Sequence, residues 1–135
     1  MPKVSKEKPD RISEAALKEK IKKELAKSPE EASIIWLVDA FVEDAFKSRA
    51  SDIHIDPSEK ALLARFRIDG VLHDAYSIPM RIHSEIISRI KVLSGLRTDE
   101  HQAAQDGRFR LKLNSTNIDI RVSIAPTYYG ENVVM

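Results

Sequence analysis

The 135-residue chain contains no cysteine, which excludes disulfides and thiolate metal sites. It has almost no net charge, because 22 basic residues face 21 acidic ones, so no overall positive field would attract nucleic acid or an anionic membrane. Aromatic residues make up only 6% of the chain, too few for a nucleic-acid stacking platform. No apolar run has the length of a membrane span, and the N-terminus lacks a signal-peptide core. A cytoplasmic protein without a nucleic-acid partner is expected.

Motifs of a self-sufficient active site are also missing. The sequence has no G-x-x-x-x-G-K-[ST] loop, no G-x-S-x-G elbow and no H-E-x-x-H pair. What remains is 42% hydrophobic, which suits one globular domain with a modest core and a polar tail.

The clearest pattern is the alternation of apolar and polar residues between Gly107 and Ile124. Phe109 and Leu111 share one face, and Ile120 and Val122 continue it after a turn at residues 114–117. A period of two over this length predicts an antiparallel hairpin with one buried face. A second hairpin is predicted over residues 61–76, closed by Asp69-Gly70, where glycine tolerates the positive φ of a tight turn.

The polar faces of these two hairpins carry a row of arginines. They are Arg65, Arg67, Arg108, Arg110 and Arg121. Planar guanidinium groups on a stiff sheet could clamp a phosphate. An ordinary solvated sheet face, with Asp69 and Asp119 as local partners, explains the same composition.

A short strand over Asp52–Asp56 is expected to precede the first hairpin and to end at Pro57. Asp52, His54 and Asp56 would share its polar face, with a spacing that a divalent cation could use. Three ligands without a fourth make a weak site, and a histidine hydrogen-bonded to a carboxylate is the simpler interpretation. No metal site is therefore assigned.

Three helices are predicted. Residues 12–27 form a thin amphipathic helix that could dock on the domain, pair with another chain or belong to a linker. A second helix starts at Ser28-Pro29-Glu30-Glu31, with Ser28 and Glu31 as a capping box, and runs to about Lys47. Its apolar face includes Ile34, Ile35, Val38, Phe41, Val42, Ala45 and Phe46. A third helix starts at Pro79 and ends at Ser94-Gly95.

Helices that alternate with hairpins indicate an α+β fold, an antiparallel sheet with helices packed on one face. Residues 1–11 are expected to be disordered, so residues 1–27 form a polar tail with a helix or linker, and residues 28–135 form the domain. Because the chain stops at Val133-Val134-Met135, in the middle of an expected strand, it is expected to be a fragment.

Several stretches, in the same order, resemble the type II secretion and type IV pilus assembly ATPases, also called traffic ATPases. Residues 50–57 are similar to the family's A-S-D-I-H-I-E-P, and residues 65–72 to its R-x-R-x-D-G-V-L hairpin. Gln105-Asp106-Gly107-Arg108 resembles its Q-D-G-R turn. Residues 119–135 resemble D-x-R-V-S-x-x-P-T-x-x-G-E-x-x-V-M, which includes Gly130 and Glu131.

The resemblance implies a PAS-like N-terminal domain that precedes a RecA-like domain in a homo-hexameric motor. Arginines of the PAS-like domain would then reach the terminal phosphates of ATP held with Mg²⁺ by the RecA-like domain of the same or a neighbouring subunit. Arg121 matches the D-x-R-V arginine, and Arg108, Arg67 and Arg65 match other family arginines. A second family arginine directly follows the V-V-M strand. The motor would associate with inner-membrane platform proteins at the cytoplasmic side.

The sequence departs from the family before Q-D-G-R. Residues 100–104, Glu-His-Gln-Ala-Ala, replace the usual basic pair and proline, so an interface role for that loop is in doubt. Because the chain lacks the phosphate-binding loop, we expect it to bind ATP weakly and to be inactive alone. The alternative from another class is a stand-alone PAS-like sensor or adaptor for a small ligand or protein.

Overall fold

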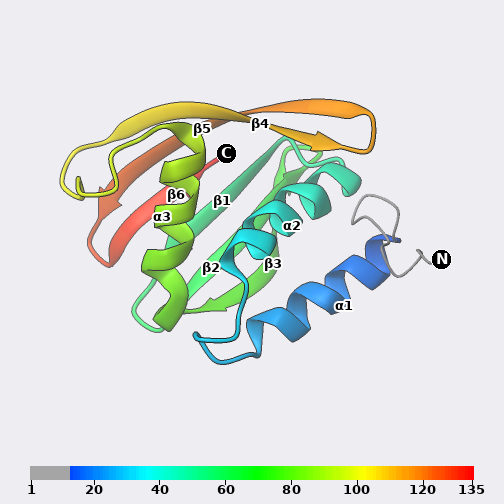
Figure 1. Cartoon of the computed structure of the whole chain (residues 1–135), viewed down its shortest axis with the longest axis horizontal. Coiled ribbons are helices and arrows are strands. Elements are labelled where there is room, and N and C mark those ends of the chain that lie inside the picture. The colour runs from blue at the N-terminus through cyan, green and yellow to red at the C-terminus, as the bar shows by residue number, and fades with distance from the viewer. Residues whose placement is uncertain (1–12) are drawn as a thin grey trace.

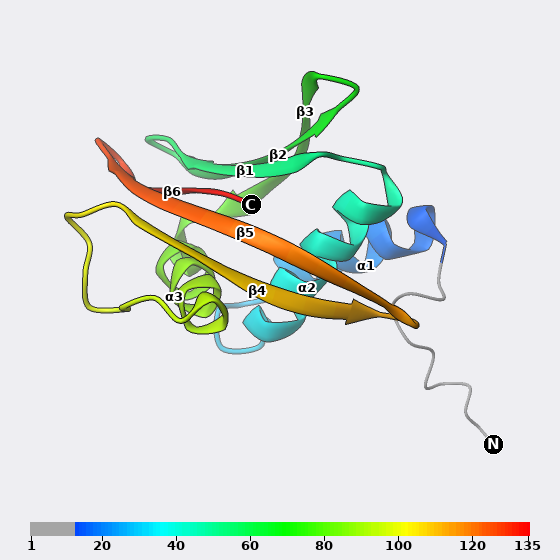
Figure 2. The ribbon, with the colours of Figure 1, turned by 90° about the horizontal axis from the view of Figure 1, so that it is seen from above.

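The computed structural model describes residues 13–135 as a six-stranded antiparallel sheet with all its helices on one face (Figures 1 and 2). The elements are α1 (Glu14–Leu25), α2 (Ile34–Lys47), β1 (Asp52–Pro57), β2 (Ala61–Ile68), β3 (Val71–Pro79), a 3₁₀ turn η3 (Met80–Ile82), α3 (His83–Ser94), β4 (Gln105–Leu113), β5 (Thr116–Thr127) and β6 (Gly130–Val134). The predicted α+β class is confirmed, and a PAS-like arrangement is compatible with it. The prediction for residues 1–11 lies outside the described residues.

The strand order is β3-β2-β1-β6-β5-β4. Two hairpin groups, β1–β3 and β4–β5, are therefore joined by the last strand, β6. Ile55 of β1 pairs with Val133 of β6, and Ser123 of β5 pairs with Val134. Every neighbouring pair is antiparallel, as the hairpins predict.

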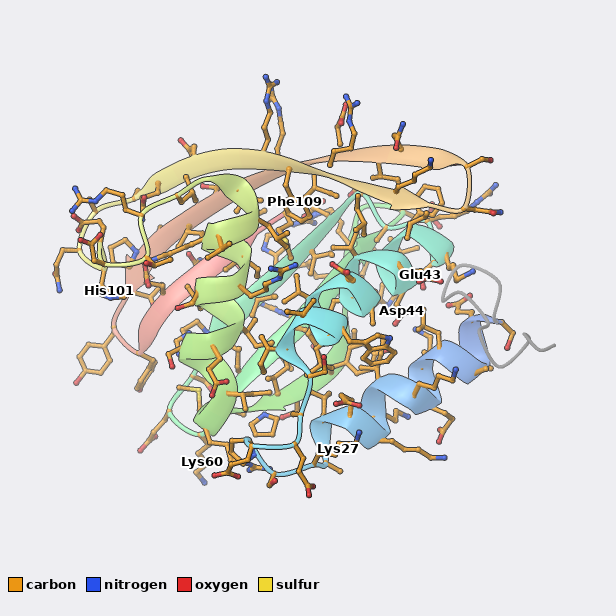
Figure 3. The ribbon with its side chains drawn as sticks, viewed as in Figure 1. Lys27, Glu43, Asp44, Lys60, His101 and Phe109 are labelled. Carbon is orange, nitrogen blue, oxygen red and sulfur yellow. The ribbon has the colours of Figure 1, made fainter. Side chains whose placement is uncertain are left out.

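The core lies between the sheet and the helices. The alternation seen in the sequence determines which side chains of each strand belong to it. Ile53 and Ile55 of β1, Phe66 of β2 and Val122 of β5 point to the helical layer and are buried. Their neighbours in the sequence point to the opposite face, which no helix covers among the described residues (Figure 2). Polar side chains of β4 and β5 therefore rise from the side away from the helices (Figure 3).

Helix α1 docks on the domain, which is the first of the three alternatives for this helix. Leu17 and Ile21 are fully buried, and such burial stabilises by roughly 1.5–3 kcal/mol per side chain. Lys18 Nζ also contacts both carboxylate oxygens of Asp44 on α2, at 2.9 and 3.0 Å (Figure 3). The hydroxyl of Tyr76 on β3 donates a hydrogen bond to the same buried carboxylate. One acidic side chain therefore connects α1, α2 and β3.

The predicted start of the second helix is wrong. Ser28 closes a single turn, accepting from the amides of Glu31 and Ala32, and the helix begins at Ile34. Ser33 is the N-cap, since its hydroxyl accepts from the amide of Trp36. The Ser33 amide also donates to Glu24 Oε2 at 2.6 Å, which fixes this cap to the end of α1.

The predicted apolar face of this helix is also too wide. Ile35 and Phe46 are exposed, with 57% and 49% of their surface accessible. Both lie on the side of α2 that neither the sheet nor a neighbouring helix covers among the described residues, because a helix resting on one layer buries only one stripe.

Gln105 and Asp106, predicted as part of a turn, instead open β4 and pair with Ile124 and Ser123. Gly107, which follows them, is explained by its closeness to the end of α3. A Cβ at Gly107 would lie 2.7 Å from the carbonyl oxygen of Ser94, so only glycine lets β4 pass this close to the end of α3.

Candidate anion-binding site

All five arginines of the two hairpins lie on the uncovered face of the sheet, since their neighbours in each strand point to the core. The face therefore concentrates guanidinium groups, as the sequence predicted. Their surroundings differ, however, and this divides them into paired and unpaired arginines.

Arg65 and Arg67 of β2 are held by the carboxylates of β1. Arg65 Nη2 lies 2.8 Å from Asp56 Oδ2. Arg67 Nε lies 3.4 Å from Asp52 Oδ2, and its Nη1 donates to the carbonyl of Gly70 at 3.1 Å. Gly70 lies in the turn between β2 and β3. Asp69 and Gly70 both have positive φ, as a tight two-residue hairpin turn requires. These contacts favour a structural role for Arg65 and Arg67.

Asp52 is the centre of this paired group. It accepts a hydrogen bond from Ser51 Oγ at 2.6 Å, and its Oδ2 lies 2.6 Å from His54 Nε2. Partial burial by itself raises the pKa of the Asp52 carboxyl, but the hydrogen bonds from Ser51 and His54 and the charges of His54 and Arg67 together lower it below its usual value. Among residues 13–135 no group of histidines and carboxylates could hold a metal ion. The contact between His54 Nε2 and Asp52 Oδ2 fits the simpler interpretation, a histidine hydrogen-bonded to a carboxylate.

Arg110 of β4 is paired too. Its Nε lies 2.8 Å from Asp119 Oδ1 on the neighbouring strand, and the hydrogen bond and charge of Arg110 lower the pKa of Asp119. Both side chains are well exposed, so solvent screens the pair and it adds little to the stability of the fold.

Arg108 and Arg121 differ from the other three. They face each other across β4 and β5, and neither has an ion pair within the described part of the chain. Like charges directly opposite on a sheet repel, and an anion bound between them removes that repulsion. Two guanidinium groups side by side can hold a phosphate or carboxylate through several charge-assisted hydrogen bonds. This pair is the candidate anion-binding site.

A hollow of about 880 Å³ opens beside the pair, between the start of β1, the end of α2 and the β4–β5 hairpin. Arg108, Arg121, Asp52 and Asp106 are among the residues that line it. Met135 and the half-exposed Phe46 are among its apolar lining residues.

The motif residues Gly130 and Glu131 lie elsewhere, at the start of β6. The Glu131 carboxylate lies 2.9 Å from the buried Nζ of Lys91 on α3, and the same ammonium donates to the carbonyl of Glu100 at 2.6 Å. His101 Nδ1 lies 3.1 Å from Glu131 Oε1, so the loop beside β6 is tied to this carboxylate (Figure 3). A Cβ at Gly130 would lie 2.7 Å from the His83 ring, which explains the glycine.

Sequence reasoning missed Lys91. Its only signal is a second stripe on α3, in which Ile87, Lys91 and Ser94 recur at helical spacing and are all buried. A lysine in such a stripe requires a buried carboxylate, and the sequence does not indicate that Glu131, forty residues later, provides it.

Taken together, the fold and the face define a class: an α+β domain that offers two unpaired arginines beside a hollow. Comparison with known proteins identifies the family. The family described as Type II/IV secretion system protein matches residues 27–135, and the chain belongs to it.

Three relatives with known names support this family assignment. The chain is 43% identical over 113 residues to the type IV pilus assembly ATPase PilB of Myxococcus xanthus. It is 45% identical over 105 residues to type II secretion system protein E of Xanthomonas campestris, and 42% identical over 112 residues to type II secretion system ATPase E of Vibrio cholerae. These matches cover 83%, 78% and 83% of this chain but only 20%, 18% and 22% of the relatives. The chain therefore spans about a fifth of their length. No helix between residues 13 and 135 is long and apolar enough to cross a membrane.

Proposed function

We propose that this chain is the PAS-like N-terminal domain of a hexameric ATPase that powers type II secretion or type IV pilus assembly. In this role the domain presents Arg121, assisted by Arg108, to the terminal phosphates of ATP bound on a RecA-like domain of the same or a neighbouring subunit. The observation that carries the proposal is the pairing pattern: Arg108 and Arg121 have no ion pair among residues 13–135, whereas Arg65, Arg67 and Arg110 each have one.

The position of Arg121 suits this chemistry. It lies mid-strand between buried Ile120 and Val122, so its backbone is held while its side chain reaches solvent. A guanidinium brought from outside the phosphate-binding loop stabilises the charge that develops on a transferring phosphoryl group. Because its contact depends on the phosphate, ATP turnover would also move this domain relative to its RecA-like neighbour and so produce mechanical work.

The group that fits the site is an anion. ATP phosphates match two guanidinium groups, and the described residues offer no ligand set for the accompanying Mg²⁺. We infer that the magnesium ion is held by the RecA-like domain. The remaining partners are then the other subunits of a homo-hexamer and inner-membrane platform proteins, with the motor at the cytoplasmic side of the membrane and no nucleic acid involved.

The test is ATP hydrolysis by a longer family protein that contains this chain and its nucleotide-binding domain. Arg121→Ala should lower kcat at least about tenfold, and by about 10³- to 10⁵-fold if Arg121 contributes as much as a typical phosphate-facing arginine. Arg110→Ala is the matched control, because Arg110 is exposed on the same face but paired with Asp119. Equal activity of both variants and the wild type would refute the phosphate contact and leave the family assignment intact.

The 135-residue chain gives a second arm of the test. Alone it should hydrolyse no ATP, since its sequence has no phosphate-binding loop. Tight binding of a small ligand to this chain, insensitive to Arg121→Ala, would instead favour the alternative of a PAS-like sensor, for which the hollow is the supporting observation.

A further inference from the structure

The two strands that carry the anion-binding pair repeat one short sequence pattern. β4 reads Asp106-Gly107-Arg108 and β5 reads Asp119-Ile120-Arg121, so each arginine follows a carboxylate of its own strand by two residues. All four charged side chains lie on the uncovered face, since they occupy the exposed positions of the alternation. Because the strands are antiparallel and Arg108 pairs with Arg121, an approximate two-fold axis through this pair relates the two copies.

The two carboxylates differ in what lies opposite them. Asp119 lies opposite Arg110, whose Nε is 2.8 Å from the Asp119 Oδ1. Asp106 lies opposite Ser123, which is uncharged. Within residues 13–135 the Asp106 carboxylate has no ion pair and no hydrogen bond. The repeated pattern therefore leaves one carboxylate without a cation, beside two arginines without an anion.

Arg121 is within reach of this carboxylate. Residues diagonal to each other on neighbouring strands are about 7–8 Å apart, a distance that a long side chain can span. The equivalent diagonal on the other side of the axis joins Asp119 to Arg108. There the charge of Arg108, in addition to the hydrogen bond and charge of Arg110, lowers the pKa of Asp119. The diagonal from Asp106 to Arg121 has the same geometry, with no arginine opposite the carboxylate.

We propose that Asp106 is the resident counter-ion of Arg121 and competes with a bound phosphate for its guanidinium. The two groups are not in an ion pair in the structure, so their contact is one that forms and breaks readily, as exposed ion pairs do. Such a competitor weakens the hold of Arg121 on an anion and so eases release of the phosphate after hydrolysis. Asp106 acts through Arg121 and is therefore a positioning residue.

This role in a motor rests on the proposed function of Arg121. The competition itself does not, because it concerns only the binding of an anion to the 135-residue chain. The two can therefore be tested separately.

The test is binding of inorganic triphosphate to the 135-residue chain in about 0.1 M salt, followed by NMR of the backbone amides of β4 and β5. Asp106→Asn keeps the shape of the side chain and removes its charge. It should tighten triphosphate binding about two- to sixfold, the gain expected when one weak, exposed ion pair no longer competes. A merely structural Asp106 would instead give weaker or unchanged binding.

Asp74→Asn is the matched control, because Asp74 is also exposed and has no ion pair among the described residues. It lies on β3, at the opposite edge of the sheet from β4 and about 24 Å away across five strand spacings. That distance exceeds two Debye lengths in about 0.1 M salt, so this variant should change binding by less than about 1.5-fold. Both variants remove one negative charge, and only the position differs.

A second comparison places Asp106→Asn in an Arg121→Ala background. There the variant should lose its effect, because the group for which the carboxylate competes is gone. The proposal is overturned if Asp106→Asn binds triphosphate no more tightly than Asp74→Asn, or if the gain is as large without Arg121. Unchanged ATP hydrolysis by Arg121→Ala in the longer protein would refute the phosphate contact alone, since a gain for Asp106→Asn in the 135-residue chain would still establish the counter-ion.

Discussion

At the scale of single residues, Lys91 is a buried charge that the fold must compensate. Its side chain is 1% exposed, and its ammonium is compensated by Glu131 and the carbonyl of Glu100. Burying an ion pair costs so much desolvation that the pair itself adds little stability, but removing one partner leaves the other charge buried and alone. The cluster therefore acts mainly by specifying where the loop after α3 and the start of β6 must meet.

Lys91→Met should destabilise the protein by about 3–5 kcal/mol, because Glu131 loses its buried cation. Urea denaturation at neutral pH measures the effect. Replacing Lys91 and Glu131 together by methionine should recover part of the loss. His101→Ala, which removes a mostly exposed partner of the same carboxylate, should cost less than about 1 kcal/mol. A loss of that size for Lys91→Met as well would contradict a compensated buried charge.

Tyr76 gives a prediction for alkaline pH. Burial, and then its hydrogen bond to Asp44 and the charge of that carboxylate, raise the pKa of Tyr76 well above its ordinary value. Above about pH 10 the unfolded chain loses this proton while the folded protein keeps it, so stability falls with pH by up to about 1.4 kcal/mol per unit. Tyr76→Phe should remove this component. Thermal melts between neutral pH and about pH 11 test it, and identical slopes for both proteins would refute the assignment.

At the scale of elements, helix α1 owes its place to packing and not to its own helical propensity. Leu17 and Ile21 are fully buried, and Leu25 nearly so, while the rest of the helix is mostly charged. An isolated helix of twelve residues is marginal in water, so most of its stability comes from this stripe and from the Lys18–Asp44 contact.

Ile21→Ala should cost about 2–5 kcal/mol, because it empties the middle of that stripe. Since α1 contacts only α2 and β3 extensively, the loss should appear first as local release of this helix. Hydrogen exchange resolved by segment would show faster exchange in α1 than in the sheet. Lys23→Ala, on the exposed face, is the control and should change neither exchange nor stability. Uniform loosening of the whole domain would contradict local release.

The elements also show what local patterns can predict. Alternation located the strands, because a half-buried sheet imposes a period of two on the sequence. The start of α2 was misplaced because Ser28 and Ser33 both have capping side chains, and only the contact from Glu24 to the Ser33 amide favours the second. Ile35 and Phe46 were assigned to the core because apolar character does not tell which side of a helix is covered.

At the scale of the whole molecule, sequence reasoning predicted the fold class and the arginine-rich face but not the strand order. The pairing of β1 with β6 joins residues almost eighty positions apart, and no local pattern encodes it. The sequence also did not show which arginines are paired, because their partners lie on neighbouring strands. Arg65 and Arg67 are neutralised by β1 across the sheet, whereas Arg108 lies opposite Arg121.

The central place of β6 has a consequence for synthesis on the ribosome. The chain is made from its N-terminus, so the β1–β3 group and the β4–β5 hairpin both emerge before the strand that lies between them. Until Gly130–Val134 leaves the exit tunnel, the two groups carry open edges that face each other without pairing. The nascent protein therefore passes through a stage of two exposed half-sheets, which is where a chaperone would be needed and where an early stop in translation would leave an aggregation-prone product.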